Sequence, residues 1–142
     1  MAQIDARGPR FGAAVTTAVL AGAIVAGPTS LGIGLIAVQT VAFALGALVG
    51  LQAQPYGVLF KVAVKPRLSG PTPLEDAAPP RFAQAVGLAF AVVALAGALT
   101  GADAVFTIAA AFALAAAFLN AAFAFCLGCE MYLLGKRLLA RS

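Results

Sequence analysis

Four apolar stretches without a charged residue dominate the hydropathy pattern of the chain. They cover residues 11–27, 31–51, 82–101 and 104 to about 125. A helix needs about 20 apolar residues to cross ~30 Å of hydrocarbon, and roughly 17 to 25 are tolerated. Each spanning segment must satisfy its own backbone hydrogen bonds in lipid, which an open sheet cannot do. The pattern therefore predicts an all-α integral membrane protein with four transmembrane helices.

Short connections join these stretches in pairs. Pro28, Thr29 and Ser30 separate the first two stretches, and Ala102 and Asp103 separate the last two. Connections of this length place consecutive helices side by side, so we expect two antiparallel hairpins. A chain of 142 residues is expected to form a single membrane domain over residues 1–142.

A longer segment that holds much of the charge lies between the two hairpins. Its first part, PYGVLFKVAVKPRL (55–68), places Lys61 and Lys65 one helical turn apart among apolar residues. This pattern predicts an amphipathic interfacial helix over about 55–65, with its lysines toward anionic lipid headgroups. The proline-bearing stretch that follows predicts an extended linker over about 69–80.

The composition supports the membrane assignment and argues against nucleic-acid binding. Hydrophobic residues make up 63% of the chain and charged residues 10%, whereas a soluble domain has about half and about a quarter. The formal net charge is +4, but the basic residues flank the apolar stretches and do not form a binding face. We therefore expect the lipid bilayer as partner and no nucleic acid.

The positions of the basic residues predict the orientation in the membrane. They precede the first stretch, lie between the hairpins, or follow the fourth stretch: Arg7, Arg10, Lys61, Lys65, Arg67, Arg81, Lys136, Arg137 and Arg141. With four crossings, all three regions fall on the same side, and the short connections carry no Lys or Arg. Because basic residues accumulate in cytoplasmic loops, we expect both termini in the cytoplasm of a multi-pass cell-membrane protein.

The two halves of the chain resemble each other. GPRFGAAV (8–15) recurs as PPRFAQAV (79–86), and GLQAQPYGVL (50–59) aligns with CLGCEMYLLG (126–135). This indicates two hairpins of equal orientation, a parallel repeat of a kind known in transport proteins. It also favours retention of the first stretch over its removal as a signal peptide, because the third stretch is its counterpart. Cys126 and Cys129 take the places of Gly50 and Ala53, so only one half carries thiols.

Amides are the notable polar residues inside the spans. Gln39 lies near the middle of the second span, Gln84 just inside the third, and Asn120 in the last part of the fourth. Interhelical hydrogen bonds, worth roughly 0.6 to 2 kcal/mol each, are the favoured interpretation, and contact with a substrate is the alternative. Small residues at helical spacing predict close helix packing or a homodimer. The absence of charge from the spans argues against a proton or ion relay.

Cys126 and Cys129 are the only cysteines, and the chain has no histidine. On a continuous helix Cys126 lies about 33 Å along from Ala104, at the cytoplasmic boundary and near the helix C-terminus. A structural disulfide is not expected in that reducing compartment. The C-x-x-C spacing suits thiol exchange, although a helix C-terminus and the adjacent Glu130 disfavour the thiolate. Helical Cβ atoms ~5 to 6 Å apart exceed the roughly 3.5 to 4.5 Å of a disulfide, so oxidation requires the helix to loosen, which Gly128 would allow.

Metal binding and simple packing remain as other interpretations of the two thiols. Two thiolates are half of a structural zinc site, and without histidine the rest must come from acids or a second subunit. Cysteine also fills packed helix ends as a small apolar residue. We predict no metal and no cofactor.

The segments IDARGPRF, PYGVLF, PPRFAQ and FCLGCEMYLL together resemble DUF4395, a bacterial membrane family of unknown function, over nearly the whole chain. The resemblance implies a small membrane protein, common in actinobacteria, without an established activity. It further implies that the protein is encoded near thioredoxin-like proteins and rhodanese-type sulfurtransferases. This makes Cys126 and Cys129 the candidate functional residues.

The leading hypothesis is a cytoplasm-facing dithiol that exchanges electrons or a persulfide sulfur with such a partner, and not a stand-alone enzyme. Either cysteine would attack and the other would resolve. Basic residues near the same surface would help to dock an acidic partner; they are Lys61, Lys65, Lys136 and Arg137. The alternatives are a transport or accessory subunit for a small sulfur species, and a structural subunit whose cysteines only pack.

Overall fold

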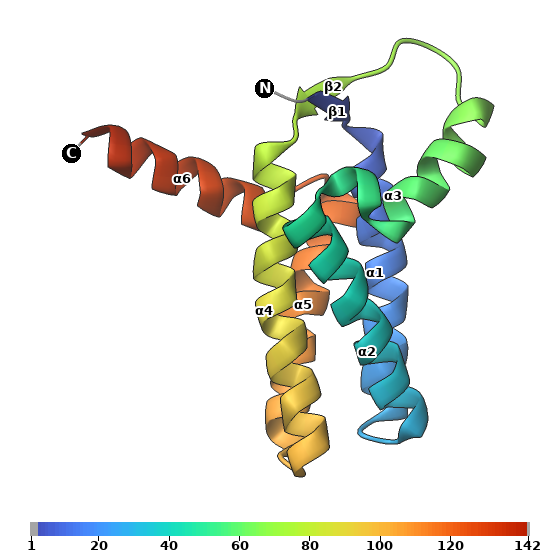
Figure 1. The fold of residues 1–142 in the computed structure, drawn as a ribbon, viewed down its shortest axis with the longest axis vertical. Helices are drawn as coiled ribbons and strands as arrows, with labels where there is room; N and C mark the ends of the chain where they lie inside the picture. Colours follow the sequence, from blue (N-terminus) through green and yellow to red (C-terminus); the bar gives the residue numbers. More distant parts are fainter. Residues whose placement is uncertain (1–2, 142) are drawn as a thin grey trace.

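The computed structural model describes residues 3–141, and within them four long helices form a bundle with shorter helical segments at one end (Figure 1). The bundle consists of α1 (Arg7–Ala26), α2 (Ser30–Ala44) with its π-helical continuation η1 (Leu45–Val49), α4 (Ala78–Thr100) and α5 (Asp103–Phe123). Each is long and apolar enough to cross a membrane. The prediction of a largely helical chain, with four helices over these stretches that are long and apolar enough to span a membrane, is therefore confirmed.

Local sequence signals define the turns at the end of the bundle farthest from the termini (Figure 1). Gly27 ends α1 with φ 70° and Gly101 ends α4 with φ 80°, a left-handed backbone that glycine adopts without steric cost. Thr29 caps α2, because its Oγ1 accepts a hydrogen bond from the N–H of Gly32 at 3.3 Å. Asp103 in the first turn of α5 complements the helix dipole.

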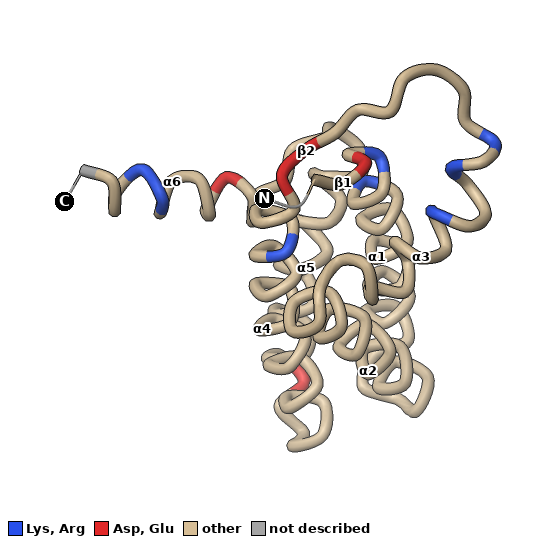
Figure 2. Tube along the Cα trace, turned by 45° about the horizontal axis from the view of Figure 1, so that its top comes forward, with Lys and Arg blue, Asp and Glu red and all other residues tan. Residues whose placement is uncertain are grey.

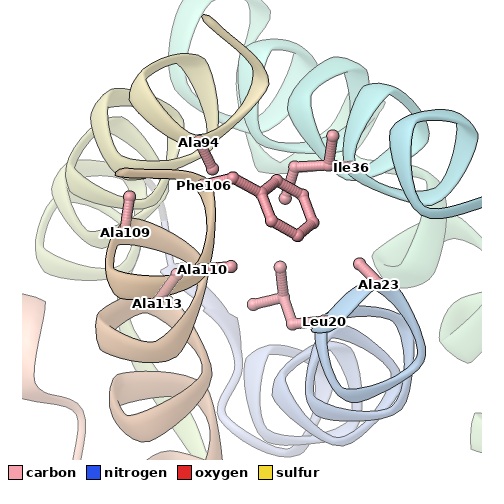
Figure 3. Packing of buried hydrophobic residues seen from close by; sticks show 8 residues of the cluster. All are labelled: Leu20, Ala23, Ile36, Ala94, Phe106, Ala109, Ala110 and Ala113. Atoms are coloured by element: carbon pink, nitrogen blue, oxygen red, sulfur yellow. The ribbon is translucent and has the colours of Figure 1, made fainter. Parts of the chain in front are cut away.

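Small side chains around one aromatic ring form the core of the bundle (Figure 3). Phe106 is fully buried and points toward Leu20 of α1 and Ile36 of α2. Alanines from α1, α4 and α5 close the cluster: Ala23, Ala94, Ala109, Ala110 and Ala113. Such small residues let the helix backbones approach closely, which is the main source of association between helices in lipid. Large apolar side chains such as Val25 and Phe112 are exposed on the outside, where lipid would cover them.

A first arm leaves the bundle after α2 and is helical along most of its length. It consists of η2 (Leu51–Ala53), α3 (Pro55–Leu59), the π-helix η3 (Phe60–Val64) and the 3-10 turn η4 (Lys65–Arg67). These segments cover the residues expected to form an interfacial helix. Phe60 is buried beside Phe11 of α1, with their ring centroids 5.8 Å apart, so the arm is anchored to the bundle by an aromatic contact.

The predicted linker over residues 69–80 is only partly a linker. Its residues Leu74–Asp76 form strand β2, which pairs antiparallel with β1 (Gln3–Asp5) through the partners Ile4 and Glu75. The last residues of the predicted linker belong to α4, because proline at the first turn of a helix needs no hydrogen-bond donor. Asp5 accepts two hydrogen bonds from the side chain of Arg7, which lower the pKa of this carboxyl below its usual value.

A second arm, α6 (Leu127–Arg141), runs sideways out of the bundle on the side opposite the first arm (Figure 1). Its first turns pack on α4, where the rings of Phe82 and Tyr132 lie 5.7 Å apart. The sequence predicted that the fourth span continues to the cysteines and that they sit at its C-terminal end. This prediction is wrong, because α5 ends at Phe123 and a new helix starts at Leu127.

The basic residues gather at the end of the molecule that carries the strands and both arms (Figure 2). Asp103 lies at the opposite end, beside the short connection between α4 and α5. The side chain of Arg141 lies outside the described part of the chain. The basic residues are thus concentrated at one end of the bundle.

Candidate functional site

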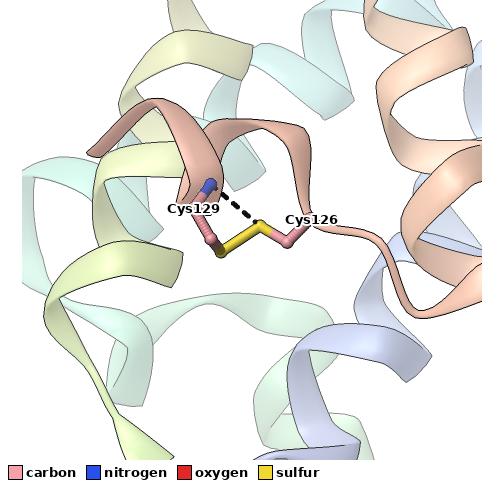
Figure 4. The surroundings of a disulfide bond; sticks show 2 residues. All are labelled: Cys126 and Cys129. Atoms are coloured by element: carbon pink, nitrogen blue, oxygen red, sulfur yellow. Dashed lines mark hydrogen bonds between the residues drawn. A yellow bond between two sulfur atoms is a disulfide. The ribbon is translucent and has the colours of Figure 1, made fainter. Parts of the chain in front are cut away.

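The two cysteines form a disulfide at the point where α6 begins (Figure 4). Cys126 precedes the helix, and its Sγ accepts a hydrogen bond from the N–H of Cys129 at 3.1 Å. Its carbonyl oxygen accepts the N–H of Glu130 at 3.0 Å. Cys126 therefore caps the N-terminus of α6. Cys126 lies outside the regular helix. Its Cβ atom is therefore not held at the helical spacing from that of Cys129, and the two sulfur atoms can bond.

This location reverses the electrostatic expectation from the sequence. The pair was expected at a helix C-terminus, where the dipole disfavours a thiolate, but Cys126 lies at a helix N-terminus. There the partial positive charge of the helix and the N–H of Cys129 both favour the thiolate on Cys126. Both cysteines are half-buried, so part of each residue remains exposed on the surface of the fold.

The sequence analysis did not predict the helix break, which occurs at Ala124. Ala124 adopts a left-handed backbone with φ 54°. Its N–H bonds to the carbonyl of Asn120 at 3.1 Å, and the N–H of Phe125 bonds to that of Leu119 at 3.2 Å, which closes the end of α5. Gly128 then packs against Ala83 of α4. Gly128 was the only local signal, since neither proline nor glycine marks the break itself.

A cavity of about 380 Å³ adjoins the disulfide and extends among α1, α4 and α5. Cys126 and Cys129 line one end, and Thr16 and Phe43 also contribute to its wall. Most of the wall is apolar. The polar exceptions near the cysteines are Arg10, Glu75, Gln84 and Asn120. Sequence segments far apart in the chain thus meet around the sulfur atoms.

The three amides predicted in the spans have different surroundings. Gln39 is fully buried and away from the cavity; its Nε2 donates to Oγ1 of Thr16 at 3.3 Å, and its Oε1 accepts from the Tyr56 hydroxyl at 2.9 Å. Gln84 and Asn120 line the cavity. Among residues 3–141, no hydrogen-bond donor reaches the buried Oε1 of Gln84. Gln39 therefore ties helices together, whereas Gln84 and Asn120 contribute to the cavity wall.

Two charged residues of the cavity wall were not assigned to the site from the sequence. Glu75 lies on β2, and partial burial raises the pKa of its carboxyl above the ordinary value. Arg10 lies on α1, and its Nε donates to the carbonyl oxygen of Ala121 at 3.1 Å. Only the pairing of β1 with β2 brings Glu75 to the cavity, and nothing in the linker sequence indicates that pairing.

The basic residues expected to dock a partner are not brought together. Lys61 and Lys65 lie on the first arm, and Lys136 and Arg137 lie on α6, which extends to the other side (Figure 2). Lys65 also faces Asp5, with 3.8 Å between Nζ and Oδ2.

Within the part of the chain that the structure describes, no three His, Cys, Asp or Glu side chains gather in a way that could hold a metal ion.

Comparisons with known proteins place the chain in a family without indicating an activity. No curated protein and no solved structure matches it. The sequence model described as "Domain of unknown function (DUF4395)" matches residues 4–137, which is nearly the whole chain. The protein therefore belongs to the DUF4395 family.

Proposed function

We propose that the protein is a membrane-embedded thiol–disulfide exchange protein whose Cys126 and Cys129 alternate between disulfide and dithiol. The observation that carries this proposal is the position of Cys126 as the N-cap of α6, with its sulfur accepting the N–H of Cys129. A capping thiolate is stabilised as a nucleophile and as a leaving group. We assign Cys126 as the attacking residue and Cys129 as the resolving one.

The exchange proceeds through a mixed disulfide on Cys126. The Cys126 thiolate attacks a partner disulfide, and one partner thiolate leaves. The Cys129 thiolate then attacks Sγ of Cys126, the second partner thiolate leaves, and two electrons have passed to the partner. The reverse sequence reduces the protein. A thioredoxin-like protein fits this chemistry.

A rhodanese-type sulfurtransferase is the other partner that suits the site. Cys126 would take the outer sulfur of its persulfide and leave the partner thiolate behind. Attack by Cys129 on Sγ of Cys126 would then release hydrosulfide and form the disulfide. Electron exchange and sulfur transfer require the same two cysteines, and both need a partner to reach the junction between α5 and α6. We call this junction the disulfide corner.

The distribution of charge supports a cytoplasmic location for this corner. The basic residues and both arms lie at the end of the bundle that carries the disulfide (Figure 2), and basic residues accumulate on the cytoplasmic side. We therefore propose that both chain ends and the disulfide face the cytoplasm. There the disulfide is one state of a redox cycle and not a permanent crosslink.

Equivalent contacts in the two halves support the proposed internal repeat. Arg10 of α1 bonds to the carbonyl of Ala121, and Arg81 of α4 bonds to those of Ala47 and Leu48. Gln54 caps the first arm by accepting the N–H of Gly57 at 2.9 Å, as Cys126 caps the second. The scaffold then has two similar corners, and the thiols occupy one of them.

A trapping experiment in cells tests the proposal. The Cys129→Ser variant retains the attacking thiol and should accumulate a mixed disulfide with a soluble partner on a non-reducing gel. Cys126→Ser should trap much less, and the double-serine variant gives the background. If Cys129→Ser captures nothing above this background, the exchange function is wrong.

A transport or accessory role for a small sulfur species is a second candidate, because the cavity lies among the helices long enough to span the membrane. Uptake of labelled thiosulfate or sulfite into vesicles, unchanged by replacing both cysteines with serine, would favour this role over thiol exchange.

A further inference from the structure

We propose that the cavity beside the disulfide binds a lipid-soluble quinone, which accepts two electrons from the reduced Cys126–Cys129 pair. This inference rests on the proposed thiol exchange and names the oxidant that would complete the cycle. A cytoplasmic dithiol partner would reduce the disulfide, and the quinone would restore it.

The location of the cavity indicates a ligand that dissolves in hydrocarbon. Its wall is built from α1, α4 and α5, which are apolar enough to span the membrane. Its volume of about 380 Å³ falls in the range of roughly 300 to 1,000 Å³ typical of small-molecule sites. Aromatic side chains of Phe43, Phe90 and Phe112 contribute to the wall and suit a flat, conjugated ring.

The polar groups of the wall match the oxygen atoms of a quinone. An amide offers both donors and an acceptor, so Gln84 and Asn120 can bond to quinone carbonyls and to the hydroxyls of the quinol. Oε1 of Gln84 is buried against Gly46, so the amide NH2 of Gln84 would donate to a quinone carbonyl and Asn120 would accept a quinol hydroxyl. Small sulfur anions fit less well, because Arg10 is the basic residue of the wall and its Nε already bonds to Ala121.

The chemistry balances without a further reactant. The Cys126 thiolate adds to a ring carbon of the quinone, and the Cys129 thiolate attacks Sγ of Cys126. The S–S bond forms, the carbon–sulfur bond breaks, and its electron pair remains on the ring. The two thiol protons complete the quinol. Glu75, which lines the same cavity, is placed to pass a proton.

The corresponding region of the other half is built differently. Gln54 is only 5% exposed, and a Cβ at Gly46 would lie 2.9 Å from Cγ of Gln54 and 2.6 Å from Oε1 of Gln84. A second cavity, of about 350 Å³, lies beside Pro55 and Tyr56, but its wall is almost entirely apolar and contains no cysteine.

The test uses reduced, purified protein in lipid nanodiscs with a short-chain ubiquinone and a naphthoquinone as probes. We expect one quinol per disulfide formed, followed by quinone absorbance and by thiol mass tagging. Ala117→Leu adds bulk to the cavity wall and should slow this oxidation at least tenfold. Ala115→Leu, on an exposed face of the same helix and outside the cavity wall, should leave the rate unchanged. Reduction of the disulfide by a soluble dithiol should be equal in all three proteins.

Each other result has a definite meaning. Equal quinone rates in Ala117→Leu and Ala115→Leu would show reaction outside the cavity and would overturn the inference. A protein that exchanges with soluble dithiols but is not oxidised by either quinone would also overturn it, while leaving the proposed function intact. If neither dithiols nor quinones change the redox state of the pair, both proposals fall.

Discussion

Gly128 and Ala83 lie in direct contact, and this contact sets the start of α6 against α4. A Cβ on Gly128 would lie only 2.6 Å from Cβ of Ala83 and 2.7 Å from its Cα. The neighbouring atoms belong to a helix backbone and its first side-chain carbon, so they cannot move aside without shifting α4 or α6. Gly128, one of the two residues between the cysteines, is therefore a packing requirement of the site.

Gly128→Ala should destabilise the protein by about 1 to 3 kcal/mol, as overpacking does in other cores. It should also displace Cys126 and Cys129 and slow the formation of mixed disulfides. Gly135→Ala is the matched control on α6, because a Cβ there meets no atom within 4 Å; it should stabilise the helix by roughly 0.5 to 1 kcal/mol. Thermal unfolding in detergent and trapping yields measure both effects. Equal behaviour of the two variants would contradict the packing role.

The contacts of Arg10 and Arg81 with carbonyl oxygens near the end of a neighbouring helix provide a second test, because of the two only Arg10 lines the cavity with the thiols. Arg10→Gln and Arg81→Gln should each cost about 1 kcal/mol, the usual value of a hydrogen bond at a helix end. Only Arg10→Gln should slow alkylation of the reduced Cys126, since it removes a positive charge from the cavity. A similar loss of reactivity in both variants would mean that the effect comes from stability alone.

The bundle could be predicted from the sequence because run length and charge decide which segments can lie in lipid. The absence of charge from four long stretches left little alternative to membrane-spanning helices. The hydrogen bonds of Gln39 with Thr16 and Tyr56 likewise agree with the favoured interpretation of that amide as an interhelical link. These are properties of composition and of single residues.

The site could be predicted only as a pair of thiols, because its geometry depends on contacts between distant segments. The break at Ala124 carries no proline or glycine, and the apolar run continues through it to Leu127. The approach of α6 to Ala83 places the break, and the pairing of β1 with β2 brings Glu75 to the cavity. Neither contact has a local signature that periodicity could reveal.

The stability of the strand region should depend on pH through Glu75. Burial raises the pKa of Glu75 in the folded protein above its ordinary value of 4.5, so the folded state binds its proton more tightly than the unfolded state does. The resulting cost is absent below about pH 4.5 and appears as the pH rises through the folded pKa. Glu75→Gln should therefore raise the unfolding temperature at pH 7 and change it little at pH 4.

Asp5 provides the control of opposite sign for the same region. Hydrogen bonds from Arg7 lower its pKa below the ordinary value of 3.8, so its contribution to stability is present at pH 7 and is lost only on strong acidification. Asp5→Asn should lower the unfolding temperature at pH 7. If Glu75→Gln also lowers the unfolding temperature at pH 7, Glu75 takes part in a stabilising contact and burial of its carboxylate does not destabilise the fold.

The capping position of Cys126 predicts a difference in reactivity between the two thiols. In the reduced protein, the N-terminal dipole of α6 and the N–H of Cys129 stabilise a thiolate on Cys126. Cys129 lies inside the first turn of the helix and has no such donor among the hydrogen bonds of the described residues. At pH 7, iodoacetamide should therefore alkylate Cys129→Ser several-fold faster than Cys126→Ser, as mass spectrometry can follow. The difference should shrink in denaturant, where α6 is lost. Equal alkylation rates in the folded variants would remove the physical basis for assigning attack to Cys126. A difference in rate that persists in denaturant would mean that the local sequence, and not the helix, causes the difference.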